Sequence, residues 1–338
     1  MPVCLVIQPI HPVGIERLAA AGIEVRLASG SDMDTVACEI RDVDAVITRD
    51  AGMSAKALDN AARLLVVANH GAGTNRVDVA HAGRLGIPVV YTPNLNARSV
   101  AEHTLMLMMA VGRHVVAADR AVRQGNWRFR FEQPMQALYG KTLGIVGFGA
   151  IGRAVAAMAV QAFGLQVLAW SPSLGNQQGD CQGVHRVDTL AELLRCSDIV
   201  SLHRPLRPDT HHTLDRAAFA QMKRGAIVIN TSRGPLIDEA ALVDALTSGH
   251  LSGAGLDVFD VEPLDTASPL TSLDNVVLTP HSAGATGQAL RDTALCCAEQ
   301  IMDVLLDVQP KHLVDASVWP VRRRRAGAMP GTRQESPV

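Results

Sequence analysis

The stretch Thr142-Leu-Gly-Ile-Val-Gly-Phe-Gly-Ala-Ile-Gly152 decides the fold of this chain. Its apolar residues before Gly147 predict a short buried strand, and the small residues after Gly152 predict a helix. Gly147, Gly149 and Gly152 form a G-x-G-x-x-G pattern between the two. In this context the first glycine permits a tight turn, the second lets the backbone approach a pyrophosphate, and the third allows close helix–strand packing. The pattern predicts a dinucleotide site at a helix N-terminus. The alternative is a glycine-rich turn without a ligand.

Composition limits the classes of protein that this chain can represent. Its 338 residues suggest about two domains, and a hydrophobic content of 48% is ample for buried cores. A net charge of −2 and few aromatic residues argue against a nucleic-acid or membrane surface as the main partner. No apolar window reaches the ~18 residues of a membrane span, and no signal peptide is recognisable. The six cysteines form no C-x-x-C pair, so we expect reduced thiols in a cytoplasmic protein without a metal site.

Two series of alternating strands and helices follow one another along the chain. Short apolar runs that alternate with helical patterns predict parallel sheets covered on both faces. The first series has strand-like runs at residues 3–7, 25–27, 43–48, 64–68 and 88–91. The second has them at 142–146, 166–170, 198–202, 226–230, 253–257 and 276–279, which suits a six-stranded doubly wound sheet.

Two long helical patterns lie at the borders of the second series, at 99–123 and 286–308. The second comes after the last predicted strand, so we expect it to return to the N-terminal domain and make that domain discontinuous. The predicted fold is α/β with two doubly wound parallel-sheet domains. Residues 1–98 and 286–318 form one domain and 99–285 the other. Residues 319–338, which include Arg322-Arg-Arg-Arg325, are expected to be a disordered, solvated basic tail, with a nucleic-acid patch as the alternative.

Three polar segments begin where predicted strands of the second series end. They are Asn230-Thr-Ser-Arg233, Asp257-Val-Phe-Asp-Val-Glu262 and Thr279-Pro-His281. The carboxyl ends of strands in an open α/β sheet line the ligand crevice, so these segments are expected to converge.

The side chains of Arg233, Glu262 and His281 suit the reduction of a 2-keto acid. Arg233 can pair with a carboxylate through its fork of donors and polarise the neighbouring carbonyl. His281 can exchange the alcohol proton, and Glu262 can hold the imidazole and favour its cation. Taken singly, these residues are more often a surface arginine, a solvated glutamate and a capping histidine. Their shared position at strand ends favours a functional set.

With these segments in view, the chain resembles the D-isomer-specific 2-hydroxyacid dehydrogenase family over about residues 40–310. The segments that match its motifs are Gly147–Gly152, Asn230–Asp238, Leu256–Pro263, Thr279–Gly284, Gly71–Gly73, Asn94–Asn96 and Ser99–Glu102. The resemblance implies a Rossmann-type nucleotide domain, a flavodoxin-like substrate domain, two helices that cross between them, and a homodimer.

The resemblance also implies which residues form the site. The catalytic set is Arg233, Glu262 and His281. The substrate-binding set is Ala72, Gly73, Asn96, Arg233 and His281. The cofactor-binding set is Gly147, Gly149, Ala150, Ile151, Gly152, Ser171, Arg204, Pro205, Thr231, Ser232, Arg233, Asp257, His281 and Ala283.

The ribose position departs from the usual NAD pattern. About 20 residues after the glycines, an acidic residue normally accepts hydrogen bonds from the ribose 2′-hydroxyl. Ser171 stands there in this chain, so a 2′-phosphate is not repelled. No basic residue follows directly, although Arg204 can lie along the adenosine side. The hypothesis is therefore NAD or NADP with a lean to NADP, and a relaxed site with weak preference is the alternative.

The favoured function is that of an oxidoreductase. It transfers a hydride between NAD(P)H and the C2 carbonyl of a small 2-keto acid, such as glyoxylate or hydroxypyruvate, to give a D-2-hydroxy acid. Phosphoglycerate dehydrogenation is an alternative. Formate oxidation ranks lower, because family members with that activity carry Gln where Glu262 stands. An alternative from another class is an NAD(H)-sensing, corepressor-like binding protein.

Overall fold

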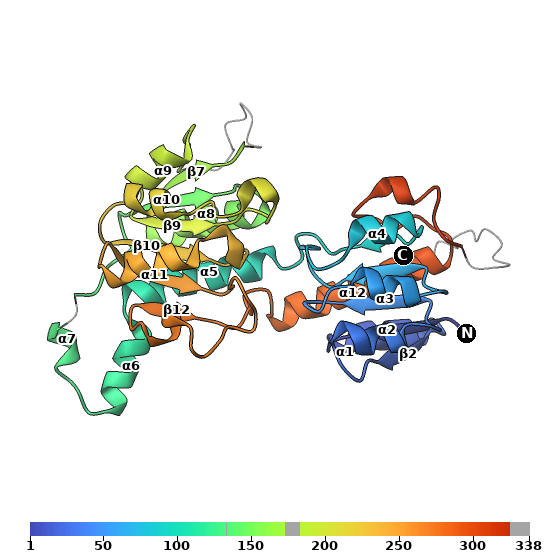
Figure 1. Ribbon diagram of the computed structural model, residues 1–338. Coiled ribbons are helices and arrows are strands. Elements are labelled where there is room, and N and C mark those ends of the chain that lie inside the picture. The colour runs from blue at the N-terminus through green and yellow to red at the C-terminus, as the bar shows by residue number, and fades with distance from the viewer. Residues whose placement is uncertain (133, 173–182, 325–338) are drawn as a thin grey trace. The chain divides into compact units, whose positions relative to one another are not determined.

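The computed structural model describes residues 1–132, 134–172 and 183–324 (Figure 1). The chain divides into two compact units. Unit 1 consists of Met1–Asn96 and Ala285–Val338, and unit 2 consists of Ala97–Gly284. Each unit contains one sheet, and every strand pair in both sheets is parallel.

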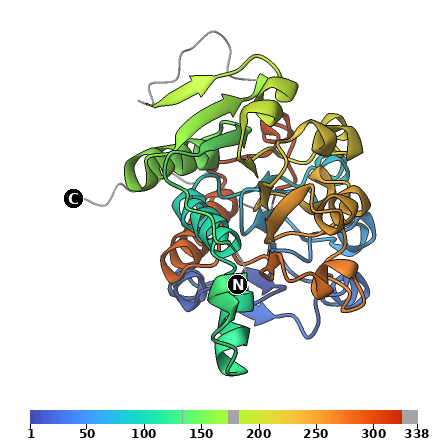
Figure 2. The ribbon, with the colours of Figure 1, turned by 90° about the vertical axis from the view of Figure 1, so that its left-hand side faces the viewer.

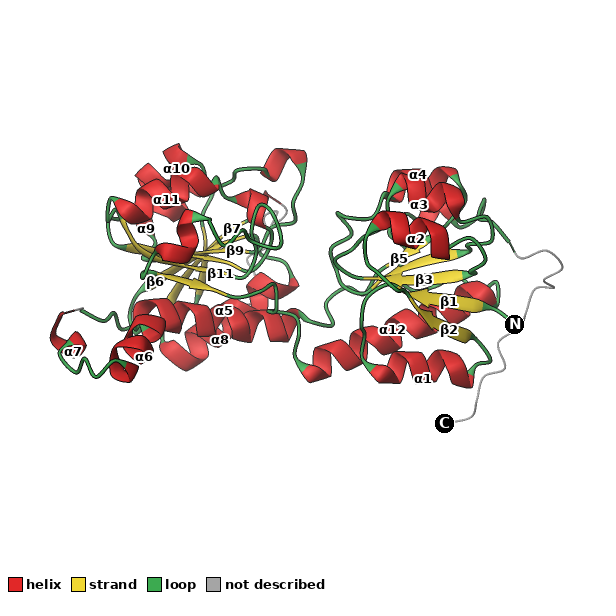
Figure 3. Cartoon of the chain, turned by 60° about the horizontal axis from the view of Figure 1, so that its bottom comes forward, coloured by secondary structure: helices red, strands yellow, loops and turns green. Residues whose placement is uncertain are grey.

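Unit 1 has a five-stranded sheet in the order β2-β1-β3-β4-β5, the flavodoxin-like order. Its strands are β1 (Val3–Val6), β2 (Glu24–Leu27), β3 (Ala45–Thr48), β4 (Val66–Asn69) and β5 (Val89–Val90). Its helices are α1 (Pro12–Ala20), α2 (Met33–Glu39), α3 (Ala55–Asn60), α4 (Val79–Arg84) and α12 (Gly287–Leu305). Figure 3 shows α2, α3 and α4 on one face of this sheet and α1 and α12 on the other. Residues of β1, β3 and β4 are buried from both sides, which explains their unbroken apolar runs.

The C-terminal helix α12 packs against α1 within unit 1. Gly14 makes this approach possible, because a Cβ there would lie 2.9 Å from both the Cβ and the carbonyl oxygen of Ala294. The buried residues Cys297, Ile301 and Val304 of α12 join the same apolar cluster as β1 and β3. The last long helix therefore completes the core of the N-terminal unit.

Unit 2 has a seven-stranded sheet in the order β12-β11-β10-β9-β6-β7-β8. Its strands are β6 (Thr142–Val146), β7 (Gln166–Trp170), β8 (Val184–Arg186), β9 (Ile199–Leu202), β10 (Ala226–Asn230), β11 (Leu251–Leu256) and β12 (Val276–Leu278). Figure 2 shows the yellow-green edge of this sheet, which β7 and β8 form. The strand order reverses between β6 and β9, and ligands of open α/β sheets bind at such a switch point.

Helices cover both faces of the seven-stranded sheet (Figure 3). One face carries α5 (Ala97–Gly112) and α8 (Ala150–Phe163), and the other carries α9 (Leu190–Cys196), α10 (Arg216–Gln221) and α11 (Glu239–Thr247). Two further helices, α6 (Val115–Arg123) and α7 (Phe129–Glu132), extend away from the sheet (Figure 1). Short 3₁₀ helices lie at Pro208–Thr210, Gly234–Leu236, Pro269–Ser272 and, in unit 1, Ala316–Val318. The predicted α/β class with two parallel-sheet domains is confirmed.

The prediction of one continuous helix over residues 99–123 is wrong, because two helices form there. α5 ends at Gly112, and α6 starts after His114, whose φ of 50° is left-handed. The backbone N–H of Gln136 donates to the carbonyl of Gly112 at 2.8 Å, so a distant segment takes an acceptor that a continuous helix would use. The short helix α7 follows α6 after Gly125.

The prediction of six strands in unit 2 is also wrong. The sheet has a seventh strand, β8, which pairs with β7 at the edge. It has only three residues, Val-His-Arg, and two of them are exposed, so it lacks the apolar run of a buried strand.

Part of the expected solvated tail packs against unit 1. Arg322 is 5% exposed in its side chain, pairs with Asp307 and stacks on Trp319. Arg323 donates to the carbonyls of Ala61, Ala62 and Leu64. Specific partners therefore hold residues 319–324, which corrects the expectation for them, and residues 325–338 lie outside the described part of the chain.

Among the described residues, no helix is both long and apolar enough to cross a bilayer. The same residues contain no group of three or more His, Cys, Asp or Glu arranged to hold a metal ion.

Candidate active site

The glycine loop joins β6 to α8 at the switch point of the unit 2 sheet. Gly147 has a φ of +100°, and a Cβ there would lie 2.6 Å from the carbonyl oxygen of His203. A Cβ on Gly152 would lie 2.3 Å from the carbonyl oxygen of Gly147. Gly149, the N-cap of α8, differs because a Cβ would meet nothing within 4 Å. The space beside Gly149 is therefore open at the N-terminus of α8, where the first N–H groups of a helix can bind an anion.

Ser171 and Arg204 follow β7 and β9, on either side of β6. The guanidinium of Arg204 lies 5.1 Å from the centre of the Trp170 ring and 3.7 Å from a carboxylate oxygen of Asp209. Its side chain is 14% exposed, and burial lowers the pKa of Arg204 from its usual value. The carbonyl of Arg204 accepts a 2.5 Å hydrogen bond from the Ser232 hydroxyl. A cation is thus held near the end of the strand that precedes Ser171.

Asn230 shapes the loop that presents Arg233. It is the last residue of β10 and is 1% exposed. Its side-chain amide donates to the carbonyl of Arg233 at 2.8 Å, and its side-chain oxygen accepts the N–H of Ser232 at 3.0 Å. The Thr231 hydroxyl lies 2.9 Å from that of Thr104 on α5. These contacts fix the backbone from Thr231 to Arg233.

The structure brings Glu262 and His281 into direct contact. Glu262 Oε2 lies 2.9 Å from His281 Nδ1, and Glu262 Oε1 accepts the N–H of Phe259 at 3.1 Å. His281 follows β12 and has a φ of +51°, and its side chain is 34% exposed. A carboxylate on one ring nitrogen sets the tautomer and orientation of a histidine and stabilises its cation.

Asp257 lies between these two segments, directly after β11. It is 1% exposed, and its carboxylate accepts the backbone N–H groups of Ser282 and Ala283, both at 2.9 Å. Its carbonyl accepts the N–H of His281 at 2.9 Å. Asp257 therefore holds the backbone on which His281 sits. Three neighbouring strands, β10, β11 and β12, supply Arg233, Asp257 with Glu262, and His281.

The remaining predicted substrate contacts lie in unit 1, and Pro205, which follows β9, lies in unit 2. Ala72 and Gly73 are exposed in the loop after β4, and Asn96 is the last residue before unit 2. Asn69, the last residue of β4, donates through its side-chain amide to the carbonyls of Gly71 and Gly73 at 3.0 and 3.1 Å. Asn69 thus ends β4 and forms hydrogen bonds with the loop that follows, as Asn230 does after β10 in unit 2.

One buried histidine precedes the Gly71–Gly73 loop. His70 is 9% exposed, and burial lowers its pKa to about 4. Its Nε2 has no hydrogen-bond partner among the described residues. The side chain is therefore neutral at pH 7, which keeps an uncompensated charge out of the core.

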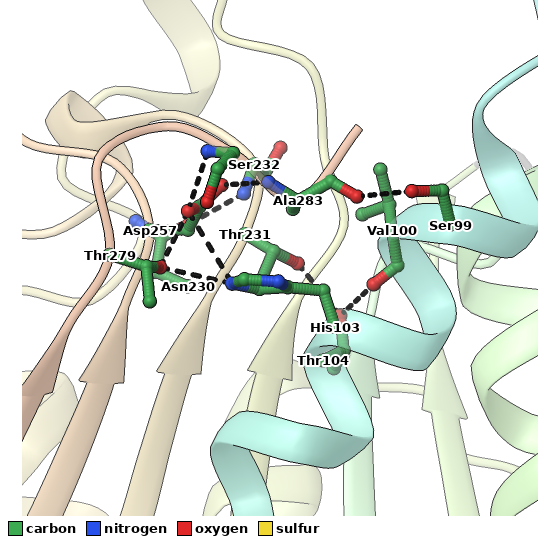
Figure 4. A network of polar contacts seen from close by, with 11 residues as sticks. Ser99, Val100, His103, Thr104, Asn230, Thr231, Ser232, Asp257, Thr279 and Ala283 are labelled. Atoms are coloured by element: carbon green, nitrogen blue, oxygen red, sulfur yellow. Dashed lines mark hydrogen bonds and ion pairs between the residues drawn. The ribbon is translucent and has the colours of Figure 1, made fainter. Parts of the chain in front are cut away.

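Sequence reasoning missed several residues that organise the site. Asn69 was not predicted at all, and Asn230 was named only as the first residue of its segment, without a role. Both end strands just before glycine-containing loops, and that recurring placement is a signal that the sequence offers. His103 and Ser99 of α5 contact Thr279 and Ala283 (Figure 4). Ser99 lies in a segment that the sequence had marked, but neither contact could be predicted, because the partners lie 176 and 184 residues away.

Comparison with known proteins places this geometry in a family. The sequence profile described as "D-isomer specific 2-hydroxyacid dehydrogenase, NAD binding domain" matches residues 105–283. The chain belongs to the D-isomer specific 2-hydroxyacid dehydrogenase family. The matched region contains all three predicted catalytic residues, Arg233, Glu262 and His281.

The chain is similar to two kinds of named enzyme within the family. It is 38% identical to a D-3-phosphoglycerate dehydrogenase of Methanocaldococcus jannaschii over 92% of its own length, but it spans only 59% of that protein. It is 39% identical to a glyoxylate reductase of Korarchaeum cryptofilum over 84% of its own length and 86% of that enzyme.

Solved structures of the family agree with the fold. An NADPH-dependent glyoxylate/hydroxypyruvate reductase from Sinorhizobium meliloti, solved with NADP and malonate, gives a TM-score of 0.83 at 29% identity. That comparison covers 96% of this chain and 99% of the other. A Thermus thermophilus protein gives a TM-score of 0.84 at 35% identity, with 93% of this chain and 100% of the other covered.

Substitutions of Gly149 and Gly152, two of the three glycines in the loop, are expected to have opposite effects. Gly149→Ala should leave the Tm nearly unchanged, because its Cβ meets no protein atom, yet weaken dinucleotide binding about tenfold or more by filling the space for the pyrophosphate. Gly152→Ala should lower the Tm, because its Cβ meets the Gly147 carbonyl. Thermal unfolding and fluorescence titration with NADPH measure the two effects. Wild-type affinity in Gly149→Ala would refute a pyrophosphate site at this loop.

Proposed function

We propose that this chain reversibly reduces a small 2-keto acid, of the glyoxylate or hydroxypyruvate kind, to the D-2-hydroxy acid with NAD(P)H. The observation that carries the proposal is the 2.9 Å contact between Glu262 and His281 at the carboxyl edge of the unit 2 sheet, with Arg233 on the neighbouring loop. The glyoxylate reductase and glyoxylate/hydroxypyruvate reductase among its relatives support this substrate class.

In this proposal each side chain has a separate task. Arg233 binds the substrate carboxylate through paired, charge-assisted hydrogen bonds and draws electron density from the adjacent carbonyl. His281 gives a proton to the C2 oxygen during reduction and takes it back in the reverse direction. Glu262 holds Nδ1, so that Nε2 is the atom that serves the substrate, and stabilises the imidazolium. Ala72, Gly73 and Asn96 remain predicted substrate contacts on unit 1.

The residues present fit a dinucleotide. The open space at Gly149 and the free N–H groups of the first turn of α8 suit the pyrophosphate. Thr231, Ser232, Asp257 and Ala283 would line the nicotinamide side, and Ser171, Arg204 and Pro205 the adenosine side. When bound, the nicotinamide supplies or accepts the hydride.

Removal of either charged group should abolish most turnover. His281→Ala is expected to lower kcat about 10²- to 10⁴-fold through loss of acid–base catalysis. Arg233→Ala is expected to lower kcat/KM at least about a hundredfold, because two charge-assisted hydrogen bonds are lost. Arg195→Ala, an exposed arginine on α9, is the control and should retain wild-type rates. Rates near wild type in either site variant would contradict the assignment.

We also propose that NADPH serves at least as well as NADH. Ser171 provides no carboxylate to repel a 2′-phosphate, and Arg204 supplies a nearby cation. Structures of an acyclic imino acid reductase with NADPH and of the Sinorhizobium reductase with NADP support this lean.

A substitution at position 171 tests the cofactor proposal. Ser171→Asp should reduce the ratio of kcat/KM for NADPH to that for NADH about tenfold or more, because the new carboxylate repels the phosphate and accepts hydrogen bonds from a ribose hydroxyl. Ser171→Asn is the control, because asparagine is nearly the same size as aspartate but carries no charge. A wild type that strongly prefers NADH would overturn the lean to NADP.

Phosphoglycerate dehydrogenation is the second candidate, since several curated relatives have that name. The chain spans 56–59% of the length of the first two of them. Assay of 3-phosphoglycerate with NAD⁺ beside glyoxylate and hydroxypyruvate decides between the two. Greater kcat/KM for the phosphorylated substrate would favour this candidate.

We further propose a cytoplasmic homodimer joined through α6 and α7. Exposed apolar side chains gather there, and Val116, Trp127 and Phe131 are 45%, 68% and 77% exposed. Such a patch is typical of an association surface.

The cysteines in the described part of the chain are free thiols, as expected in a reducing compartment. Cell fractionation that places the protein elsewhere would reject this location.

Sedimentation analysis tests the homodimer. The wild type is expected at twice the mass of one chain, and Phe131→Glu should shift it toward the monomer, because a charge is costly to bury in an apolar interface. Leu306→Glu, an equally drastic change at an exposed leucine of unit 1, is the control and should remain dimeric. A monomeric wild type would exclude the dimer.

A further inference from the structure

A histidine on α5 reaches the segment that carries His281. His103 Nε2 lies 3.0 Å from the hydroxyl oxygen of Thr279 and 3.5 Å from Asp257 Oδ1 (Figure 4). The Thr279 hydroxyl lies 2.6 Å from the same carboxylate oxygen. His103 is 17% exposed in its side chain and Asp257 is 1% exposed, so these contacts are made largely away from water.

The chemistry of these groups fixes the direction of the hydrogen bonds. An ionised carboxylate only accepts, so the Thr279 hydroxyl donates its one proton to Asp257. The Thr279 oxygen can then only accept from His103, which requires a proton on Nε2 of the ring. The result is a chain of donors that runs from His103 through Thr279 to Asp257.

Asp257, the last acceptor in this chain of hydrogen bonds, also binds the backbone around His281. Its two carboxylate oxygens accept the N–H groups of Ser282 and Ala283, and its carbonyl accepts the N–H of His281. His281 has a left-handed φ of +51°, a conformation that a non-glycine residue keeps only when its surroundings impose it. The direction of the Asp257 carboxylate thus decides how firmly this turn is held.

α5 braces the site at two further points. Ser99 donates to the carbonyl of Ala283 at 2.6 Å, and Thr104 contacts the hydroxyl of Thr231. Figure 4 shows these contacts on the same side of the helix as His103. Of the three, only the His103 contact reaches the carboxylate that holds both amides after His281.

We propose that His103 is a positioning residue for the reaction: through Thr279 it orients the Asp257 carboxylate and so holds the turn that presents His281. This inference rests on the proposed function for its kinetic effect, but the structural relay does not depend on the identity of the substrate. His103 contacts Thr279 and Asp257, and its effect on His281 passes through these two residues.

Substitutions at both ends of the relay test the proposal. His103→Leu and Thr279→Val should each lower kcat with glyoxylate and NADPH about tenfold, the cost of one good hydrogen bond. The KM for glyoxylate should stay within about threefold, since Arg233 keeps its own contacts. His103→Gln, whose amide N–H can replace that at Nε2, and Thr279→Ser, which keeps the hydroxyl, should recover most of the loss.

The double variant separates a relay from two independent packing effects. If His103 acts through Thr279, His103→Leu combined with Thr279→Val should be no slower than the worse single variant. Multiplicative losses, or wild-type kcat in His103→Leu, would overturn the proposal.

Hydrogen–deuterium exchange gives a readout without substrate. His103→Leu should speed exchange of the Ser282 and Ala283 amides about tenfold and leave the β6 amides unchanged. Faster exchange in both segments would mean general destabilisation and overturn the positioning role, as would no change in either. Absence of keto-acid turnover in the wild type would refute the proposed function alone, because the exchange result still decides the relay.

Discussion

Parallel pairing of every strand in the seven-stranded sheet is the constraint on which the site depends. Because all strands run in one direction, their carboxyl ends meet at one edge, and the loops after β6, β9, β10, β11 and β12 leave there. The central strands β6, β9, β10 and β11 are buried on both faces, so polar side chains cannot lie along them without cost. Polar chemistry is therefore confined to the ends of the strands, where Arg233, Asp257 and His281 lie.

The strand ends alone do not hold these side chains in place. Asn230, Asp257 and Asn69 are buried polar residues at the ends of β10, β11 and β4, and each bonds to backbone groups of the loop that follows or neighbours it. Burial makes such contacts strong, since unpaired polar groups in these positions are costly. In unit 2, α5 adds a second layer of support through Ser99, His103 and Thr104 (Figure 4).

Local patterns predicted most elements of the fold because their physical cause is local. The alternation of apolar runs and helical segments indicated nearly all the strands and the parallel arrangement. The errors have non-local causes. The break between α5 and α6 depends on an amide 24 residues away in sequence, from Gln136 to Gly112. β8 forms by pairing with the edge strand β7, and Arg323 in the C-terminal segment bonds to carbonyls of Ala61 and Leu64.

The amino-acid sequence was enough to identify the glycine loop, the two α/β series, and Arg233, Glu262 and His281 as the candidate reacting groups. Each lies in a short segment whose geometry follows from neighbouring residues. The pairing of Glu262 with His281, 19 residues apart, was expected from their places at strand ends, but its distance comes from the packed sheet. The His103–Thr279 contact joins residues 176 apart and was not expected from the sequence. Such contacts depend on how distant strands and helices pack, and no pattern of spacing along the chain encodes them.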